Sequence, residues 1–227
     1  MKTLLTVGTA ALALMALPTA AHAQDADRAG DFQAKVVMTG VLPDGAIEEI
    51  NVDLVGLPAD TQTKANDNYV PTVAIEYFVT HNFSIETIAG VTQHDVDAVS
   101  GLPVGAELVS DALILPATVT GKAHFDVGGV KPYIGAGATY WFILDDEPGE
   151  FTIPLGVTDF DFQDEFGLVL QAGIDIPVGD EGFGITFDAK RYFIDLTAQW
   201  FAGDTLVIEN EHELDPWVVS AGVSYRF

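Results

Sequence analysis

Serine and histidine are the side chains of this sequence whose chemistry could supply a nucleophile and its base. Hydrolysis and acyl transfer need such a pair within hydrogen-bond reach, with a third group that orients the base. Beyond residue 23 the candidates are Ser84, Ser100, Ser110, Ser220, Ser224, His81, His94, His124 and His212. No pair has a spacing that places both side chains on one outward-facing patch, and a lone inward histidine belongs more often to a polar network. We therefore expect no enzymatic activity.

Metal and phosphate chemistry find little support either. The sequence has no cysteine, no His-x-His motif and no cluster of histidines, so it lacks a ligand set for a transition metal. Gly135-x-Gly137 lies in an alternating segment that is typical of a strand and does not resemble a phosphate-binding loop. We expect no bound cofactor and no dedicated metal site.

The last eleven residues alternate like a β-strand with one apolar face. That face carries Trp217, Val219, Ala221, Val223, Tyr225 and Phe227. Trp217 and Tyr225 lie about 26 Å apart along such a strand, at roughly 3.3 Å per residue. A tilt of about 45° leaves roughly 19 Å across a membrane, which is close to the spacing of two aromatic girdles. The segment predicts the closing strand of an outer-membrane β-barrel.

Seven earlier segments alternate in the same way and predict an all-β, eight-stranded antiparallel transmembrane barrel. They are Phe32–Val41, Tyr69–Val79, Phe83–Thr92, Leu113–Val127, Lys131–Leu144, Phe166–Ile176 and a strand that begins at Phe183. The eighth strand would pair with the first, which removes the exposed edges of the sheet.

The faces opposite the apolar ones carry polar and charged residues that we expect to point into the barrel. These are Lys35, Glu76, Glu86, Lys122, His124, Asp126, Asp175, Asp188, Lys190 and Arg226. Eight strands enclose an interior just wide enough for side chains, so we expect these groups to pair and plug the lumen. Most of them lie in the periplasmic half by the expected strand directions, so any ligand channel should lie in the outer half.

The start of the sequence predicts a secretory signal peptide over residues 1–23, with cleavage between Ala23 and Gln24. Lys2 precedes an apolar run from Leu4 to Leu17, and Ala21-His22-Ala23 provides a site of small residues. The run is short for a membrane-spanning helix, although an anchor helix is the alternative. The remaining chain, 24–227, would form one barrel domain in the outer membrane.

The expected connections alternate between short and long. The short ones are His81–Asn82, Gly128–Gly129 and Pro177–Gly182, and the long ones, 43–68, 93–112, 145–165 and 197–216, would be acidic extracellular loops. Beyond Lys2 the chain has 8 basic and 34 acidic residues, which argues against nucleic acid as a partner. Acidic loops keep a surface solvated, but they could also bind divalent cations that link them to lipopolysaccharide phosphates.

Several motifs resemble the OmpW family of outer-membrane proteins. They are Lys131–Gly137, Gln171–Asp175, Asp188–Tyr192 and the ending Asp215–Phe227, together with Gly40–Pro43 and Leu115–Thr118, and they cover essentially all of the chain beyond residue 23. The resemblance implies passive uptake of small hydrophobic molecules, with lateral exit through the barrel wall. It also implies that Phe227 is a signal for the outer-membrane assembly machinery.

Two prolines offer a physical route for lateral exit. Pro71 and Pro116 lie toward the outer ends of the second and fourth strands, both beside the third, and proline cannot donate to a β-ladder. They could instead mark the frayed starts of their strands. The candidate contacts for an apolar ligand are Tyr69, Pro71, Phe78, Pro116, Trp141 and Phe142. The alternative function is a structural or adhesive surface scaffold, which a packed or charged outer lumen would favour.

Overall fold

The computed structural model describes residues 27–163 and 165–227. The predicted signal peptide, 1–23, lies outside the described residues. The strands are β1 Phe32–Leu42, β2 Ala46–Asp53, β3 Gln62–Ala65, β4 Asn68–Phe78, β5 Phe83–Ala89, β6 Thr92–Ser100, β7 Glu107–His124, β8 Lys131–Pro148, β9 Asp159–Phe162, β10 Glu165–Pro177, β11 Phe183–Phe193, β12 Asp195–Ala202, β13 Thr205–Glu213 and β14 Trp217–Arg226, with a 3-10 turn, η1, at Ile153–Leu155. None of the described helices is long and apolar enough to cross a membrane.

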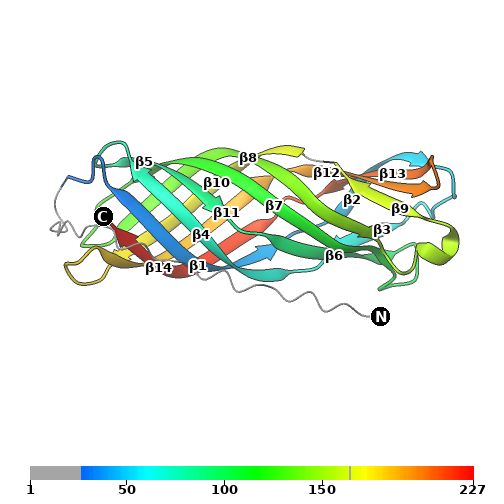
Figure 1. The fold of residues 1–227 in the computed structure, drawn as a ribbon, viewed down its shortest axis with the longest axis horizontal. Coiled ribbons are helices and arrows are strands. Elements are labelled where there is room, and N and C mark those ends of the chain that lie inside the picture. Colours follow the sequence, from blue (N-terminus) through cyan, green and yellow to red (C-terminus); the bar gives the residue numbers. More distant parts are fainter. Residues whose placement is uncertain (1–26, 164) are drawn as a thin grey trace.

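Eight strands close into an antiparallel barrel. Their order around the wall is β1, β4, β5, β7, β8, β10, β11 and β14, and β14 pairs with β1, for example at Val36 and Val223. Phe32 and Phe227 exchange backbone hydrogen bonds of 2.9 Å in both directions, so the start of β1 and the carboxy-terminus share one end, called here the proximal end. Figure 1 shows this end on the left, where C is marked. The predicted eight-stranded barrel is confirmed.

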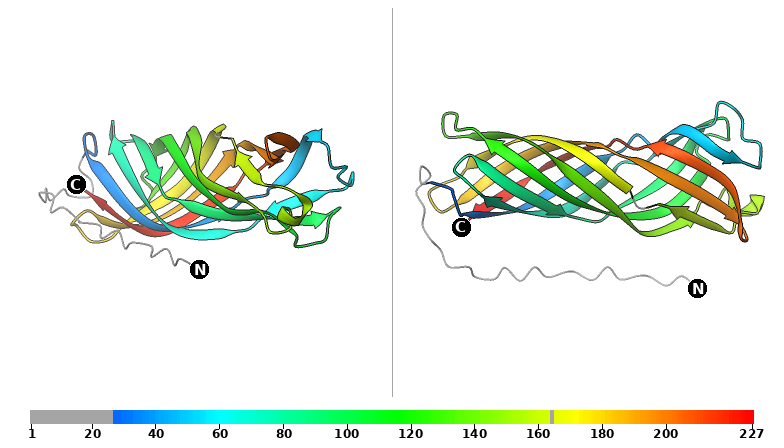
Figure 2. Two further views of the ribbon diagram at one scale, coloured as in Figure 1. Left: turned by 45° about the vertical axis from the view of Figure 1, so that its right-hand side comes forward. Right: turned by 90° about the horizontal axis from the view of Figure 1, so that it is seen from above.

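The opposite, distal end is built from strands where the sequence led us to expect long loops. The segments 43–68, 93–112, 145–165 and 197–216 contain β2, β3, β9, β13 and most of β6 and β12, which continue the wall beyond the eight-stranded section (Figures 1 and 2). β2, β13, β12 and β9 form a sheet of their own, while β3 and β6 extend the main sheet beside β7 and β8. The expectation of irregular loops is therefore corrected. The solvent faces of these strands are acidic, as at Glu209, Glu211 and Glu213 in β13, so the segments resemble solvated loops in composition.

An apolar band surrounds the proximal part of the wall between two rows of aromatic side chains. The row at the proximal end contains Phe32, Tyr77, Phe83, Phe125 and Phe183, and the second row contains Tyr69, Tyr140, Phe142, Phe166 and Trp217. Exposed aliphatic residues such as Val36, Ile85 and Leu170 lie between the rows. This pattern of an outward apolar band flanked by aromatic girdles is typical of transmembrane barrels, so the band marks the membrane-spanning section.

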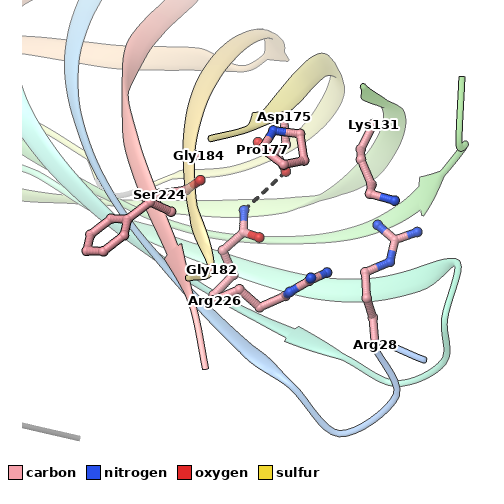
Figure 3. Close-up of a pocket in the computed structure, with 10 residues that line it drawn as sticks. Arg28, Lys131, Asp175, Pro177, Gly182, Gly184, Ser224 and Arg226 are labelled. Atoms are coloured by element: carbon pink, nitrogen blue, oxygen red, sulfur yellow. Dashed lines mark hydrogen bonds between the residues drawn. The ribbon is translucent and has the colours of Figure 1, made fainter. Parts of the chain in front are cut away.

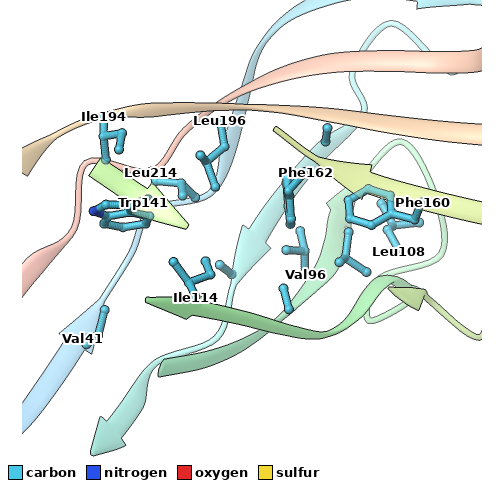
Figure 4. Close-up of a cluster of buried hydrophobic side chains, with 14 of the residues drawn as sticks. Val41, Val96, Leu108, Ile114, Trp141, Phe160, Phe162, Ile194, Leu196 and Leu214 are labelled. Atoms are coloured by element: carbon cyan, nitrogen blue, oxygen red, sulfur yellow. The ribbon is translucent and has the colours of Figure 1, made fainter. Parts of the chain in front are cut away.

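The distal extension has its own hydrophobic core (Figure 4). Leu196 and Ala198 on β12 and Val109 on β7 are completely buried, and the ring of Phe160 lies 4.9 Å from that of Trp200. Apolar side chains alternate with exposed ones along β12, as they do in the membrane-spanning strands, but here the outer face is polar. The extension is therefore a packed structure that holds its shape in water.

His212 is buried in this core, and its environment disfavours a positive charge. Its Nδ1 donates to the Gly45 carbonyl at 3.3 Å, and the ring centroids of Phe162 and Trp200 lie 6.4 and 6.3 Å from that of the imidazole. Nε2 has no hydrogen-bond partner among the residues that the structure describes. Burial lowers the pKa of His212 to about 4.

We predict that acidification weakens the distal extension through His212. In the unfolded chain the histidine takes up a proton near pH 6.5, whereas in the folded chain it does so only near pH 4, so stability is lost as the pH falls from 6.5 to 4. The full difference is about 3 kcal/mol. Hydrogen exchange of β12 and β13 at pH 7 and pH 4.5 would measure it. His212→Leu should lose this pH-dependent component, whereas His81→Gln, at an exposed turn, should keep it; equal pH dependence in His212→Leu and the unchanged chain would contradict the prediction.

Candidate functional site

Four charged side chains in the proximal half of the membrane-spanning section form a compact cluster inside the barrel. Lys35 Nζ lies 2.8 Å from Glu76 Oε2 and 2.9 Å from Glu86 Oε2. Lys122 Nζ lies 2.9 Å and 2.8 Å from the same two oxygens. The four residues come from β1, β4, β5 and β7, and all are buried. Each lysine therefore bridges two carboxylates, which compensates the charge of this cluster within the wall.

A second group of polar side chains joins this cluster from the other side of the lumen. Lys190 Nζ lies 3.4 Å from Glu86 Oε1 and 2.6 Å from Asp188 Oδ1. Gln171 Nε2 donates to Glu86 Oε1 at 2.8 Å and to Asp188 Oδ2 at 2.6 Å. The ring of Tyr133 lies 3.8 Å from Lys122 Nζ, and its hydroxyl donates to Asp188 at 2.7 Å. Polar groups from opposite walls thus meet across the barrel.

Asp175 connects the cluster to the proximal mouth (Figure 3). Its Oδ2 accepts from Gln33 Nε2 at 3.1 Å and lies 3.6 Å from Lys35 Nζ. We call the connected set the polar plug, with the members Gln33, Lys35, Glu76, Ser84, Glu86, Lys122, His124, Tyr133, Gln171, Asp175, Asp188 and Lys190. The mouth beyond it holds a pocket of only about 30 Å³.

Two of the residues expected to plug the lumen lie outside this set. Arg226 lies at the proximal mouth, with its Nε 3.7 Å from Asp31. Asp126 follows β7 in an exposed turn and contacts Arg28, His81 and Lys131. Arg28 is buried over the ring of Phe78, at 5.2 Å, and covers the plug from the proximal side. Arg28 precedes the first strand, so strand periodicity could not identify it.

Ser84, His124 and Glu76 lie together in the plug but do not have the geometry of a catalytic triad. Ser84 Oγ lies 2.8 Å from His124 Nε2, and Glu76 Oε1 lies 2.5 Å from the serine and 2.8 Å from the same Nε2. In a triad the carboxylate binds the other ring nitrogen, so that Nε2 is free to take the proton of the serine. His124 Nδ1 has no hydrogen-bond partner in the described chain, and Ser84 is fully buried. The three groups are consistent with a structural role inside the plug.

Above the plug the lumen becomes apolar. The ring of Trp141 on β8 points inward and lies 6.0 Å from the ring of Tyr192, whose hydroxyl is 3.2 Å from Thr118 Oγ1. A cavity of about 40 Å³ opens here, and its lining includes Trp141, Tyr192 and Pro116. Further out, the lumen continues into the core of the distal extension, where Ile114 and Leu214 lie near Trp141 (Figure 4).

The six candidate contacts for an apolar ligand do not form one site. Pro116 and Trp141 are opposite each other on β7 and β8, and both line the lumen cavity. Tyr69 and Phe142 point outward in the second aromatic row. Phe78 is buried but lies at the proximal end, beneath Arg28. Pro71 is exposed on the outer surface of β4.

The wall is interrupted where the two prolines face the junction of β5 and β6. Pairing of β4 with β5 stops at Val73 and Ala89, and continuation of that register would bring Val91 opposite Pro71. On the other side, the β7 register places Gly90 opposite Pro116, between the Ile88–Thr118 and Thr92–Ile114 pairs. Proline has no N–H to donate, which explains why both ladders break here. A Cβ on Gly90 would lie 2.3 Å from Thr72 Cγ2, so glycine is required at this close approach.

The interruption of pairing lies beside the lumen cavity. Val70, Thr72 and Gly90, which border the break, also line the cavity. On the distal side the break ends at Asn68, whose Nδ2 donates to the Gln93 carbonyl at 2.8 Å. Tyr69, beside it, belongs to the second aromatic row. We call this break the β4–β5 window.

We predict that Glu86→Gln destabilises the barrel. Glu86 contacts three lysines, so loss of its charge removes one buried ion-pair partner from each of them. Removal of one partner from a buried ion pair costs about 3–5 kcal/mol. Urea unfolding in lipid vesicles, followed by tryptophan fluorescence, would measure the change. Glu49→Gln, on the exposed face of β2, is the matched control, and an unchanged unfolding midpoint in Glu86→Gln would contradict the prediction.

Comparisons with known proteins agree with this architecture. A model of the OmpW family matches residues 28–227. The uncharacterized outer-membrane protein y4mB of Sinorhizobium fredii is 32% identical over 223 residues, which cover 96% of this chain and 90% of the relative. Outer membrane protein W of Vibrio cholerae is 25% identical over 220 residues, which cover 95% and 94% of the two chains.

A solved structure shares the fold. The crystal structure of the outer membrane protein OprG from Pseudomonas aeruginosa superposes with a TM-score of 0.78 at 24% identity, and the match covers 88% of this chain and 97% of OprG. The match to the family model spans the whole described barrel, and the predicted outer-membrane location is confirmed with it. The chain belongs to the OmpW family of outer-membrane β-barrel proteins.

Proposed function

We propose that this barrel admits small hydrophobic molecules from outside the cell and releases them sideways into the outer membrane. The observation that carries the proposal is the division of the interior. The polar plug closes the proximal half, whereas the lumen above it is apolar and borders the β4–β5 window. The distal end faces outward in this proposal, because both ends of the described chain meet at the proximal end, which would face the periplasm.

The route follows from the energetics of transfer. An apolar solute that leaves water gains about 25 cal/mol for each Å² of apolar surface that it buries. It then passes from the apolar lumen around Trp141 to lipid without crossing a charged region. The plug blocks the straight path, because a solute there would have to separate Lys122 from Glu76 and Glu86. Sideways exit is therefore the path of lower free energy.

For a sugar, transfer from water into the apolar lumen would be unfavourable. Its hydroxyl groups would lose their hydrogen bonds with water in the apolar lumen, and each unpaired group costs roughly 1–3 kcal/mol. The membrane-spanning section also has no water-filled channel in the described chain, because plug side chains occupy its centre. The proposal therefore excludes a general porin, and no chemical step on the solute is part of it.

The proposal also includes partners other than the transported solute. Membrane lipid and lipopolysaccharide would surround the barrel, and divalent cations could bridge its acidic distal surface to lipid phosphates. Phe227, whose ring stacks at 6.2 Å on Phe32, would be read by the assembly machinery before the barrel closes. A surface scaffold is the second candidate, and the tight packing of the distal core, with Val109 and Leu196 completely buried, is the observation that favours it.

We predict that liposomes or deletion cells that contain the barrel take up octane faster than those without it, with no gain for glucose. The apolar lumen lowers the barrier for the alkane alone, so the ratio of the two rates is the measurement. A heat-denatured barrel controls for leakage of the bilayer. Entry of neither solute would contradict the transport proposal and favour the scaffold.

We predict that Pro71→Val with Pro116→Val slows octane uptake severalfold. The new N–H groups allow pairing toward Val91 and Gly90, so the ladders can close across the β4–β5 window. Pro132→Val, at the proximal end of β8, is the matched control and should leave uptake unchanged. Uptake that stays at the original rate in a folded double variant would exclude the window as the exit.

A further inference from the structure

The distal extension contains a second cavity, separate from the lumen cavity beside Trp141. It has a volume of about 370 Å³, which is within the range of small-molecule sites. Its wall combines residues from all four distal segments, among them Leu57, Leu108, Phe151 and Ile208. Trp200 also lines the cavity, and its indole N–H donates to the Leu108 carbonyl at 3.2 Å. We call it the tip cavity.

The tip cavity opens to solvent through an apolar rim. Val55 and Leu155 line it and are 57% and 70% exposed. Leu54 and Val104 nearby are also largely exposed. Large apolar side chains that face water outside the membrane-spanning section are unfavourable unless they serve an interaction, so the rim indicates an entrance for an apolar group.

Two buried polar atoms in the wall lack partners. Thr61 Oγ1 and Asn210 Oδ1 have no hydrogen-bond partner within residues 27–163 and 165–227, and their residues are 4% and 3% exposed. Both residues line the tip cavity. A buried polar group without a partner costs roughly 1–3 kcal/mol, so a ligand that supplies the missing hydrogen bond recovers this free energy.

The charge around the cavity selects against anions. Among the residues that the structure describes, those that line the cavity are all uncharged. The distal segments are strongly acidic, and Asp60, Asp204 and Glu209 are close in sequence to lining residues. Across the segments 43–68, 93–112, 145–165 and 197–216, the sequence has one lysine, Lys64, and no arginine. A carboxylate ligand would enter against this negative field and find no cation, whereas a neutral hydroxyl would find an acceptor at Asn210 and a hydroxyl at Thr61.

We propose that the tip cavity is a binding site for neutral amphipathic molecules, with an aliphatic chain of medium length and one hydroxyl group. The aliphatic chain of the ligand packs against Leu108, Phe151 and Trp200. The ligand hydroxyl donates a hydrogen bond to Asn210 Oδ1 and accepts one from Thr61 Oγ1. This inference rests on the proposed function in one respect: it places the tip cavity at the start of the uptake route and names the class of solute that would bind there first. Binding itself does not depend on transport.

Trp200 provides a direct readout of binding. Full-length barrel with Trp141→Phe and Trp217→Phe, held in lipid nanodiscs, retains Trp200 as its single tryptophan. The probes are 8-bromo-1-octanol, 1-bromooctane and 8-bromooctanoate at pH 8, whose bromine quenches a tryptophan that it contacts. We expect the alcohol to quench Trp200 saturably and the carboxylate to quench it only weakly.

Asn210→Leu with Thr61→Val tests the role of the two polar atoms. The half-quenching concentration of the alcohol should rise about tenfold, which corresponds to about 1.4 kcal/mol, while that of 1-bromooctane stays the same or falls. Asn51→Leu with Thr205→Val makes the same chemical changes at exposed positions and should change neither value. Equal shifts for both probes would show a merely structural role, and no shift for either would show that the polar atoms do not bind the alcohol; each result would overturn the inference.

The outcome separates this inference from the proposed function. Saturable quenching with the expected variant effect, but no octane uptake, would support the site and remove the transport proposal. Octane uptake together with an alcohol response that the variants do not alter would support transport and remove the site.

Discussion

The satisfaction of backbone hydrogen bonds within a lipid-facing wall is the constraint on which the rest of this structure depends. Neither N–H nor C=O groups can remain unpaired in hydrocarbon, so the sheet must close, as it does between β1 and β14. Closure fixes which faces point inward, and the interior then has to be filled by side chains. The pairing is interrupted beside Pro71 and Pro116, where the backbone has no donor to offer. The weakest part of the wall is therefore specified by two residues.

The interior changes character along each strand. On β7 the inward residues run from His124 and Lys122 through two threonines to Pro116 and Ile114. Neighbouring strands follow the same order, so charge meets charge near the proximal end and apolar residues meet further out. Register aligns these gradients between strands, which is why one charged plug and one apolar lumen form instead of a mixture. The division of the interior on which the transport proposal rests thus results from strand alignment.

Alternation in the sequence predicted the barrel, its closing strand and the inward faces that carry Lys35, Glu86 and Lys122. This was possible because the two faces of a strand appear in the sequence as alternate residues. The position of each residue along the barrel axis was harder to predict. Phe78 faces inward but lies at the wrong end for a ligand channel, and the contact between Ser84 and His124 depends on pairing between strands. The distal strands were expected to be loops because their solvent faces are acidic. The tip cavity, which four separate segments build, had no local signal.

The polar plug has a consequence for how this barrel enters the membrane. Its charged members come from six strands, β1, β4, β5, β7, β10 and β11, so no hairpin carries a complete set of partners. A partly inserted sheet would hold uncompensated charges in contact with hydrocarbon, at a cost of several kcal/mol for each ion. Each charged group acquires its ion-pair partners from other strands only when the strands meet. The plug therefore penalises incomplete insertion intermediates and makes closure of the barrel an all-or-none event.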